Sequence, residues 1–66
     1  MVITLNGERF ELPNPMTVSD VLLHLDIDAR RVAIEHNLEI IKRRTFETAV
    51  VKDGDRLEIV NAVGGG

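Results

Sequence analysis

An Asn6-Gly7 dipeptide separates two short segments of alternating residue type, and it constrains the fold of this chain more than any other feature. A two-residue type I′ turn needs positive φ at both central positions, which Asn and Gly adopt at low cost. The dipeptide therefore predicts a β-hairpin of residues 2–5 and 8–12, with one apolar face. The predicted cross-strand pairs are Met1–Leu12, Val2–Glu11, Ile3–Phe10 and Thr4–Arg9.

One amphipathic helix is predicted after the hairpin. Pro13-Asn14-Pro15 ends the second strand, because proline cannot donate to a strand ladder. Thr17 is the expected N-cap, and Asp20 three residues later completes a capping box. Four apolar residues then recur at i, i+3, i+4 and i+7, so a single stripe faces the core. They are Val18, Val21, Leu22 and Leu25, and Asp26-Ile27-Asp28 ends the helix.

The rest of the chain is predicted to form short strands and turns. Extended segments are expected at 32–34, at 40–41 and from 56 to 63. Residues 36–37 and 52–55 are expected to form turns, with glycine supplying positive φ in the second. Residues 45–48 are expected to form one helical turn.

These elements indicate an α+β fold of the β-grasp type. One helix against one face of a mixed sheet of four to five strands covers both apolar surfaces, and a right-handed crossover joins the strands that flank it. The predicted domain spans residues 1–63, followed by a flexible tail of residues 64–66.

The composition limits the possible functions. An apolar fraction of 44% supports a real core, but 66 residues leave little room for a substrate pocket, so the chain is not expected to be an enzyme. There is no cysteine, and two histidines, His24 and His36, are too few for a metal site without a clear carboxylate partner. A net charge of −3 argues against nucleic-acid binding, and no apolar run approaches the length of a membrane span. We expect a cytoplasmic protein that is monomeric when free.

Three consecutive glycines, Gly64, Gly65 and Gly66, close the sequence. A glycyl carboxylate on such a stalk suits a partner enzyme that draws a chain end into a narrow site. The alternative is a frayed terminus without a role. Apolar residues precede the glycines and either form a docking patch or complete the core; they are Val60, Ala62 and Val63.

Several motifs together resemble the ThiS family, the ubiquitin-like β-grasp sulfur carriers of thiamine biosynthesis. They are Asn6-Gly7, Thr17-Val18, Val32-Ala33-Ile34, Ile40-Ile41, Asp53-Gly54-Asp55 and Val63-Gly64-Gly65-Gly66. The resemblance implies that a ThiF-type adenylating enzyme uses ATP to adenylate the Gly66 carboxylate. A sulfur donor such as a cysteine desulfurase then supplies a persulfide that leaves a thiocarboxylate. Thiazole synthase takes this sulfur, and the carrier itself binds no cofactor or metal.

Three other functions remain open at this point. The small subunit of molybdopterin synthase resembles this fold and shares the Gly-Gly end, but such chains tend to be longer. A ubiquitin-like modifier joined to lysines is a second possibility. An RNA-binding module is a third, since Arg30-Arg31 and Lys42-Arg43-Arg44 could form a basic patch. However, Phe10 and Phe46 are the only aromatic residues and belong to the predicted core, so base stacking lacks a platform. We interpret the basic residues as a solvated face or as a surface that docks onto an acidic partner.

Overall fold

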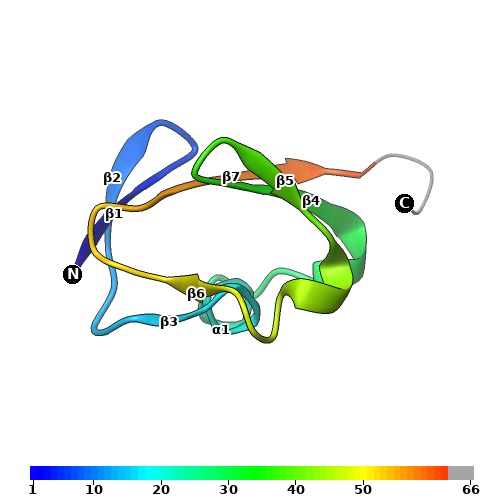
Figure 1. The fold of residues 1–66 in the computed structure, drawn as a ribbon, viewed down its shortest axis with the longest axis horizontal. Coiled ribbons are helices and arrows are strands. Elements are labelled where there is room, and N and C mark those ends of the chain that lie inside the picture. The colour runs from blue at the N-terminus through cyan, green and yellow to red at the C-terminus, as the bar shows by residue number, and fades with distance from the viewer. Residues whose placement is uncertain (63–66) are drawn as a thin grey trace.

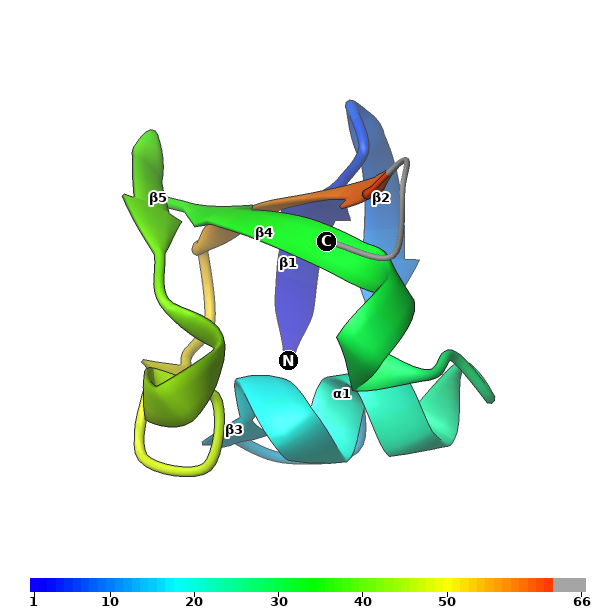
Figure 2. The same cartoon turned by 90° about the vertical axis from the view of Figure 1, so that its right-hand side faces the viewer.

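A computed structural model describes residues 1–62 and shows two layers, a sheet and a helix (Figures 1 and 2). The strands are β1 (Val2–Leu5), β2 (Glu8–Glu11), β3 (Met16–Thr17), β4 (Val32–His36), β5 (Glu39–Ile41), β6 (Val50–Val51) and β7 (Arg56–Asn61). The helices are α1 (Val18–His24) and the short 3-10 helices η1 (Ala29–Arg31) and η2 (Arg43–Thr45). The mixed sheet has five strands in the order β2-β1-β7-β4-β5, and β3 pairs with β6 in a separate ladder beside α1. The predicted β-grasp architecture is confirmed.

The N-terminal hairpin forms as predicted. Asn6 and Gly7 have φ values of 49° and 82°, and Ile3 lies opposite Phe10 in the antiparallel register. The Asn6 side chain has a second role, because its Oδ1 accepts the Ile59 N–H at 2.7 Å and its Nδ2 donates to the Ile59 carbonyl at 3.2 Å. These bonds extend the parallel pairing of β1 with β7 past the end of β1. The turn residue thus joins the hairpin to the central strand.

Helix α1 begins at the predicted capping box. The Thr17 hydroxyl accepts the Asp20 N–H at 3.1 Å, and the Asp20 carboxylate accepts the Thr17 N–H at 3.4 Å. The helix ends at His24, and the chain reverses through Asp26, which has a φ of 58°. His24 is exposed and its ring contacts Phe10 edge-on, with centroids 6.3 Å apart. The predicted apolar stripe of this helix faces the sheet.

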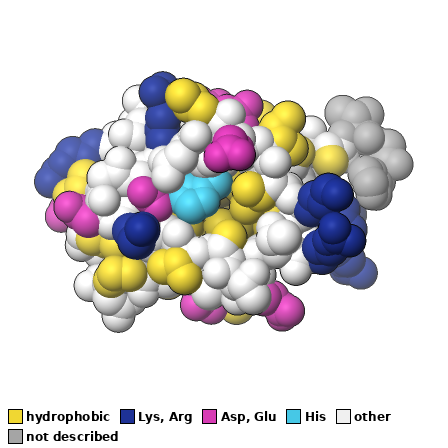
Figure 3. All heavy atoms as spheres, in the orientation of Figure 1, with side chains coloured by type: hydrophobic (Ala, Val, Ile, Leu, Met, Phe, Trp, Pro, Cys, Tyr) yellow, Lys and Arg dark blue, Asp and Glu magenta, His cyan; other side chains and the backbone are white. Residues whose placement is uncertain are grey.

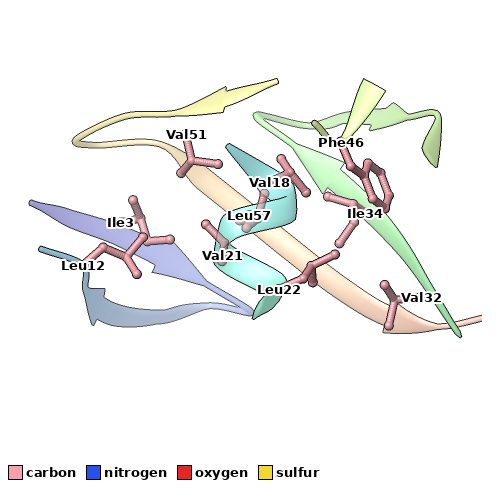
Figure 4. Close-up of a cluster of buried hydrophobic side chains, with 10 residues drawn as sticks. All are labelled: Ile3, Leu12, Val18, Val21, Leu22, Val32, Ile34, Phe46, Val51 and Leu57. Atoms are coloured by element: carbon pink, nitrogen blue, oxygen red, sulfur yellow. The ribbon is translucent and has the colours of Figure 1, made fainter. Parts of the chain in front are cut away.

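Ten buried apolar residues fill the space between the two layers (Figure 4). Three of them lie on α1, and four lie on strands β1, β4 and β7 of the five-stranded sheet. Phe46 follows η2, Val51 lies on β6, and Leu12 follows β2. They are Ile3, Leu12, Val18, Val21, Leu22, Val32, Ile34, Phe46, Val51 and Leu57. Among the residues that the structure describes, no polar side chain is buried in this core.

The structure differs from the sequence-based expectation in several local details. The helical turn expected at 45–48 is the 3-10 helix η2, two residues earlier, and Phe46 is its C-cap. His36 belongs to β4, so the turn expected at 36–37 consists of Asn37 and Leu38, both with positive φ. The turn at 52–55 forms as predicted, with a φ of 86° at Gly54. The last strand ends at Asn61 rather than at residue 63. Residue 63 and the predicted tail 64–66 lie outside the described residues, so the domain boundary stays a prediction.

Candidate functional site

The end of β7 is the part of the fold that leads to the three glycines. β7 lies between β1 and β4; it pairs with β1 at Arg56 and Leu57 and with β4 from Leu57 to Asn61. Asn61 is paired with Val32, and the Ala62 N–H donates to the Arg31 carbonyl at 2.8 Å. The N-terminus lies at the opposite end of the molecule from the end of β7 (Figure 1). Pairing with β4 and the bond to Arg31 therefore place the chain up to residue 62 and direct it away from the N-terminus.

Val60 lies on the outer face of the sheet, the face turned away from α1. Its side chain is 56% exposed, so the interpretation that Val60 completes the core is wrong. Ala62 is half-buried, and Val63 lies outside the described residues. Of the predicted docking residues, Val60 is the one that the structure presents clearly to solvent.

Two further apolar residues extend this exposed surface. Ala33 is the cross-strand partner of Val60, and Ile40 on β5 is 80% exposed. We call Ala33, Ile40 and Val60 the outer-face patch. A shallow hollow of about 100 Å³ lies over it; its lining residues are Ala33, Ile34, Glu35, Ile40, Glu58 and Val60. Sequence reasoning missed Ile40, although neighbouring isoleucines in a strand must point to opposite faces, so one of Ile40 and Ile41 had to be outside.

A pair of carboxylates borders the outer-face patch. Glu35 on β4 is directly opposite Glu58 on β7, and both are half-buried. Like charges placed directly opposite each other in a sheet are unfavourable in the free protein. The outer face therefore combines apolar contact area with negative charge, a combination that suits a protein surface carrying a basic group.

The basic residues lie at the end of the molecule where β7 terminates. The Arg43 guanidinium donates from Nη2 to the Arg30 carbonyl at 3.3 Å, which brings η2 next to η1. Arg30 also forms a salt bridge with Asp28 at 3.0 Å. The side-chain hydrogen bond from Arg30 lowers the pKa of Asp28 to about 2. The basic pair Arg30-Arg31 and the basic triplet 42–44 thus form one cluster in space.

His36 and Asp55 form a hydrogen-bonded pair at the start of β7, far along the strand from the chain end. Nε2 of His36 and Oδ2 of Asp55 are 2.8 Å apart, and the side chains are only 16% and 13% exposed. The same carboxylate accepts the Lys52 N–H at 2.9 Å. Burial alone would raise the pKa of Asp55, but the hydrogen bonds from His36, the Lys52 backbone and Asn37 outweigh it and hold the pKa below its usual range. In the described part of the chain no Ser or Thr hydroxyl bonds to the His36 ring, so we interpret the pair as fixing the turn.

A second, open hollow of about 360 Å³ lies beside α1, lined by Ser19, Leu22, Leu23, Ile27, Asp28, Ala29 and Glu47. It is larger than we expected of so small a chain, but it contains no histidine and its Asp28 is bonded to Arg30. Within residues 1–62, no three His, Cys, Asp or Glu side chains are grouped as a metal site. No helix in these residues has the length and apolar character needed to cross a membrane.

Comparison with known proteins gives consistent results. The model of the ThiS family matches residues 3–66. The sulfur carrier protein ThiS of Bacillus subtilis is 36% identical over 66 residues, which cover 98% of this chain and all of the relative. The crystal structure of ThiS from Geobacter metallireducens superposes with a TM-score of 0.89 and 33% identity, and covers the whole of both chains.

A longer relative carries the same segment as part of its chain. Thiazole synthase of Paramagnetospirillum magneticum is 44% identical over 66 residues, which are all of this chain but 20% of the relative. The chain therefore spans about a fifth of the length of that protein.

Proposed function

The chain belongs to the ThiS family of sulfur carrier proteins in thiamine biosynthesis, and we propose that it carries sulfur as a thiocarboxylate on Gly66. The observation that carries the proposal is the match to the ThiS crystal structure over the full length of both chains. Within that fold, β7 is the central strand of the sheet and ends five residues before Gly66. In this proposal the folded domain provides the surface that a partner binds, and the chain end provides the reacting carboxyl group.

The proposed chemistry takes place at the terminal carboxyl group. A carboxylate is a poor electrophile, so its oxygen first attacks the α-phosphorus of ATP on a ThiF-type enzyme, and pyrophosphate leaves. The terminal sulfur of a cysteine persulfide, formed by a donor such as a cysteine desulfurase, then attacks the acyl carbon and displaces AMP. A second thiol cleaves the resulting S–S bond and leaves the thiocarboxylate. The chain has no cysteine, so no side-chain thiol competes for this role.

In this scheme the carrier positions its own terminal carboxyl group, and the partner enzyme catalyses the reaction. Glycines at 64, 65 and 66 let the carboxyl group pass through a channel too narrow for side chains. ATP and any catalytic groups belong to the partner, so the carrier needs no cofactor of its own and is not an enzyme. Because the partner uses ATP, we place the reaction in the cytoplasm.

The outer-face patch is the surface that we propose for docking, together with Ala62 and Val63. Its members are apolar and exposed, and they lie on the strands next to the chain exit. Burying such a patch against a partner provides binding energy that a glycine tail alone lacks. Thiazole synthase is the proposed sulfur acceptor, since the relative named thiazole synthase includes this segment within its own chain.

A growth experiment tests the proposal. A strain without its own carrier is grown without thiamine and supplied with variants of this protein. A tag before Met1 is expected to be harmless, because the N-terminus lies at the opposite end of the molecule from the end of β7. A tag after Gly66 is expected to abolish growth, because it removes the free carboxylate. Rescue by the protein tagged after Gly66 would contradict the thiocarboxylate mechanism.

Matched substitutions test the docking surface in the same strain. Ile40→Asp and Val60→Asp place a charge within the patch while changing exposed side chains, so the fold is expected to persist. Leu23→Asp is the control, since Leu23 is 77% exposed but lies on α1, across the core from the patch. Growth is expected to fail with the first two variants and to continue with the third. Equal growth of all three would rule out the patch as the docking surface.

A further inference from the structure

Five basic side chains gather where β7 leaves the sheet. They are Arg30, Arg31, Lys42, Arg43 and Arg44, which we call the exit cluster. All five are exposed, and they make up five of the eight Lys and Arg residues of a chain whose net charge is −3. Figure 3 shows Lys and Arg side chains collected at this end of the molecule. The charge is therefore strongly segregated rather than evenly spread.

Contacts of the backbone fix this cluster relative to the chain exit. The Arg31 carbonyl accepts the Ala62 N–H, and Arg43 reaches across to the Arg30 carbonyl. Figure 2 looks onto this end and shows the two 3-10 helices on either side of it. Segments that are more than ten residues apart in sequence thus frame the point at which the described chain ends.

Three of the five basic side chains form no ion pair within the described residues. Asp28 pairs with Arg30. Across the part of the chain described by the structure, no acidic group lies within ion-pair distance of Arg31, Lys42 or Arg44. Keeping several like charges together is unfavourable unless something compensates for their repulsion. The geometry therefore points to an external anionic surface.

We propose that the exit cluster docks onto an acidic rim around the tail-binding channel of the adenylating enzyme, an inference that rests on the proposed function. ATP itself is a less suitable partner for the cluster. Gly66 is the fourth residue after Ala62, and four extended residues span at most about 14 Å. The Debye length at physiological salt is about 8 Å, which is shorter than this span. The charge of the cluster is therefore largely screened at the carboxyl group, and the cluster does not compete for the ATP phosphates there. The cluster orients the carrier so that its tail meets the channel.

The test measures association of the carrier with the ThiF-type adenylating enzyme of the same organism by stopped flow. Arg31→Glu with Arg44→Glu reverses two exposed charges of the exit cluster, and leaves the Arg30–Asp28 pair and the Arg43 contact in place. Arg9→Glu with Lys52→Glu is the control, since it changes the net charge equally at exposed positions outside the cluster. Thermal unfolding confirms that each variant is folded.

Charge reversal in the cluster is expected to slow association at least tenfold at low salt, while the control slows it less than threefold. The difference is expected to fall below twofold in 1 M salt, where the Debye length is about 3 Å. Replacing Arg31 and Arg44 by Gln is expected to give an intermediate rate. Equal slowing of both Glu variants, no slowing, or an effect that persists in 1 M salt would overturn the proposal.

Exchange of radiolabelled pyrophosphate into ATP separates this inference from the proposed function. If the wild-type carrier supports exchange but the reversed variant associates normally, only the docking proposal is wrong. If the wild-type carrier is neither bound nor adenylated, the proposed function is wrong and the docking inference falls with it.

Discussion

Leu22 is the residue whose truncation tests the packing of α1 most sharply. It is 1% exposed and lies in the middle of the core cluster (Figure 4). Leu22→Ala removes three carbons, which corresponds to roughly 2.4 kcal/mol of lost burial at about 0.8 kcal/mol per methylene. The hydrogen-bonded strands above the helix cannot collapse fully into the space, so a cavity term brings the expected total to roughly 3–4 kcal/mol. A domain of this size has a free energy of unfolding of about 3–10 kcal/mol, so the loss is severe.

Thermal and urea unfolding followed by circular dichroism measure this loss. At roughly 4–8 °C per kcal/mol, the midpoint of Leu22→Ala is expected to fall by about 12–30 °C. Leu23→Ala is the matched control, because the adjacent side chain on the same helix is 77% exposed. Its free energy of unfolding is expected to change by less than about 0.5 kcal/mol. A small effect at Leu22, or an equally large one at Leu23, would refute the helix register described above.

Three further predictions concern the local contacts. The carboxyl of Asp55 has a lowered pKa in the folded state, so its ionised form stabilises the fold above the unfolded pKa of about 3.9, and this contribution is lost as the pH falls through the folded pKa. Asp55→Asn is therefore expected to have a lower free energy of unfolding than the wild type at pH 7. Urea titrations should show this difference in free energy becoming smaller below about pH 4. A difference that does not depend on pH would contradict the prediction. Thr17→Ala removes the cap of α1 and is expected to cost about 1 kcal/mol in urea unfolding, whereas Thr48→Ala, at an exposed position in a loop, should cost less. Gly54→Ala meets no atom within 4 Å but must adopt a φ of +86°, so a loss of about 1–2 kcal/mol is expected, and no loss would show that the turn rearranges.

Features set by local chemistry were predictable from the sequence. The hairpin turn at Asn6-Gly7, the cap at Thr17 and the turn at Gly54 each depend on one or two residues whose backbone or side-chain preference is strong. The apolar stripe of α1 likewise follows from helical spacing alone. These elements were sufficient to identify the β-grasp fold.

Features that depend on the path of the chain were not predictable in this way. β3 and β6 have two residues each, too few for any periodic pattern, and their pairing joins residues more than thirty positions apart. The His36–Asp55 pair joins residues 19 positions apart. The exposure of Val60 depends on which face of β7 the helix covers. The exit cluster was visible only as two separate basic segments until the contact between η1 and η2 joined them.

The central claim is that sulfur is carried on Gly66, and intact-mass spectrometry tests it most directly. The purified chain is incubated with a ThiF-type enzyme, ATP, a cysteine desulfurase, cysteine and a thiol reductant. The account predicts a gain in mass equal to the difference between one sulfur and one oxygen atom, with alkylation of the product located at Gly66 by fragmentation. The gain should disappear without ATP and in a variant that lacks Gly66, whose carboxylate is set back by about 3.5 Å. An unchanged mass in the complete reaction, or sulfur located on any other residue, would contradict the account.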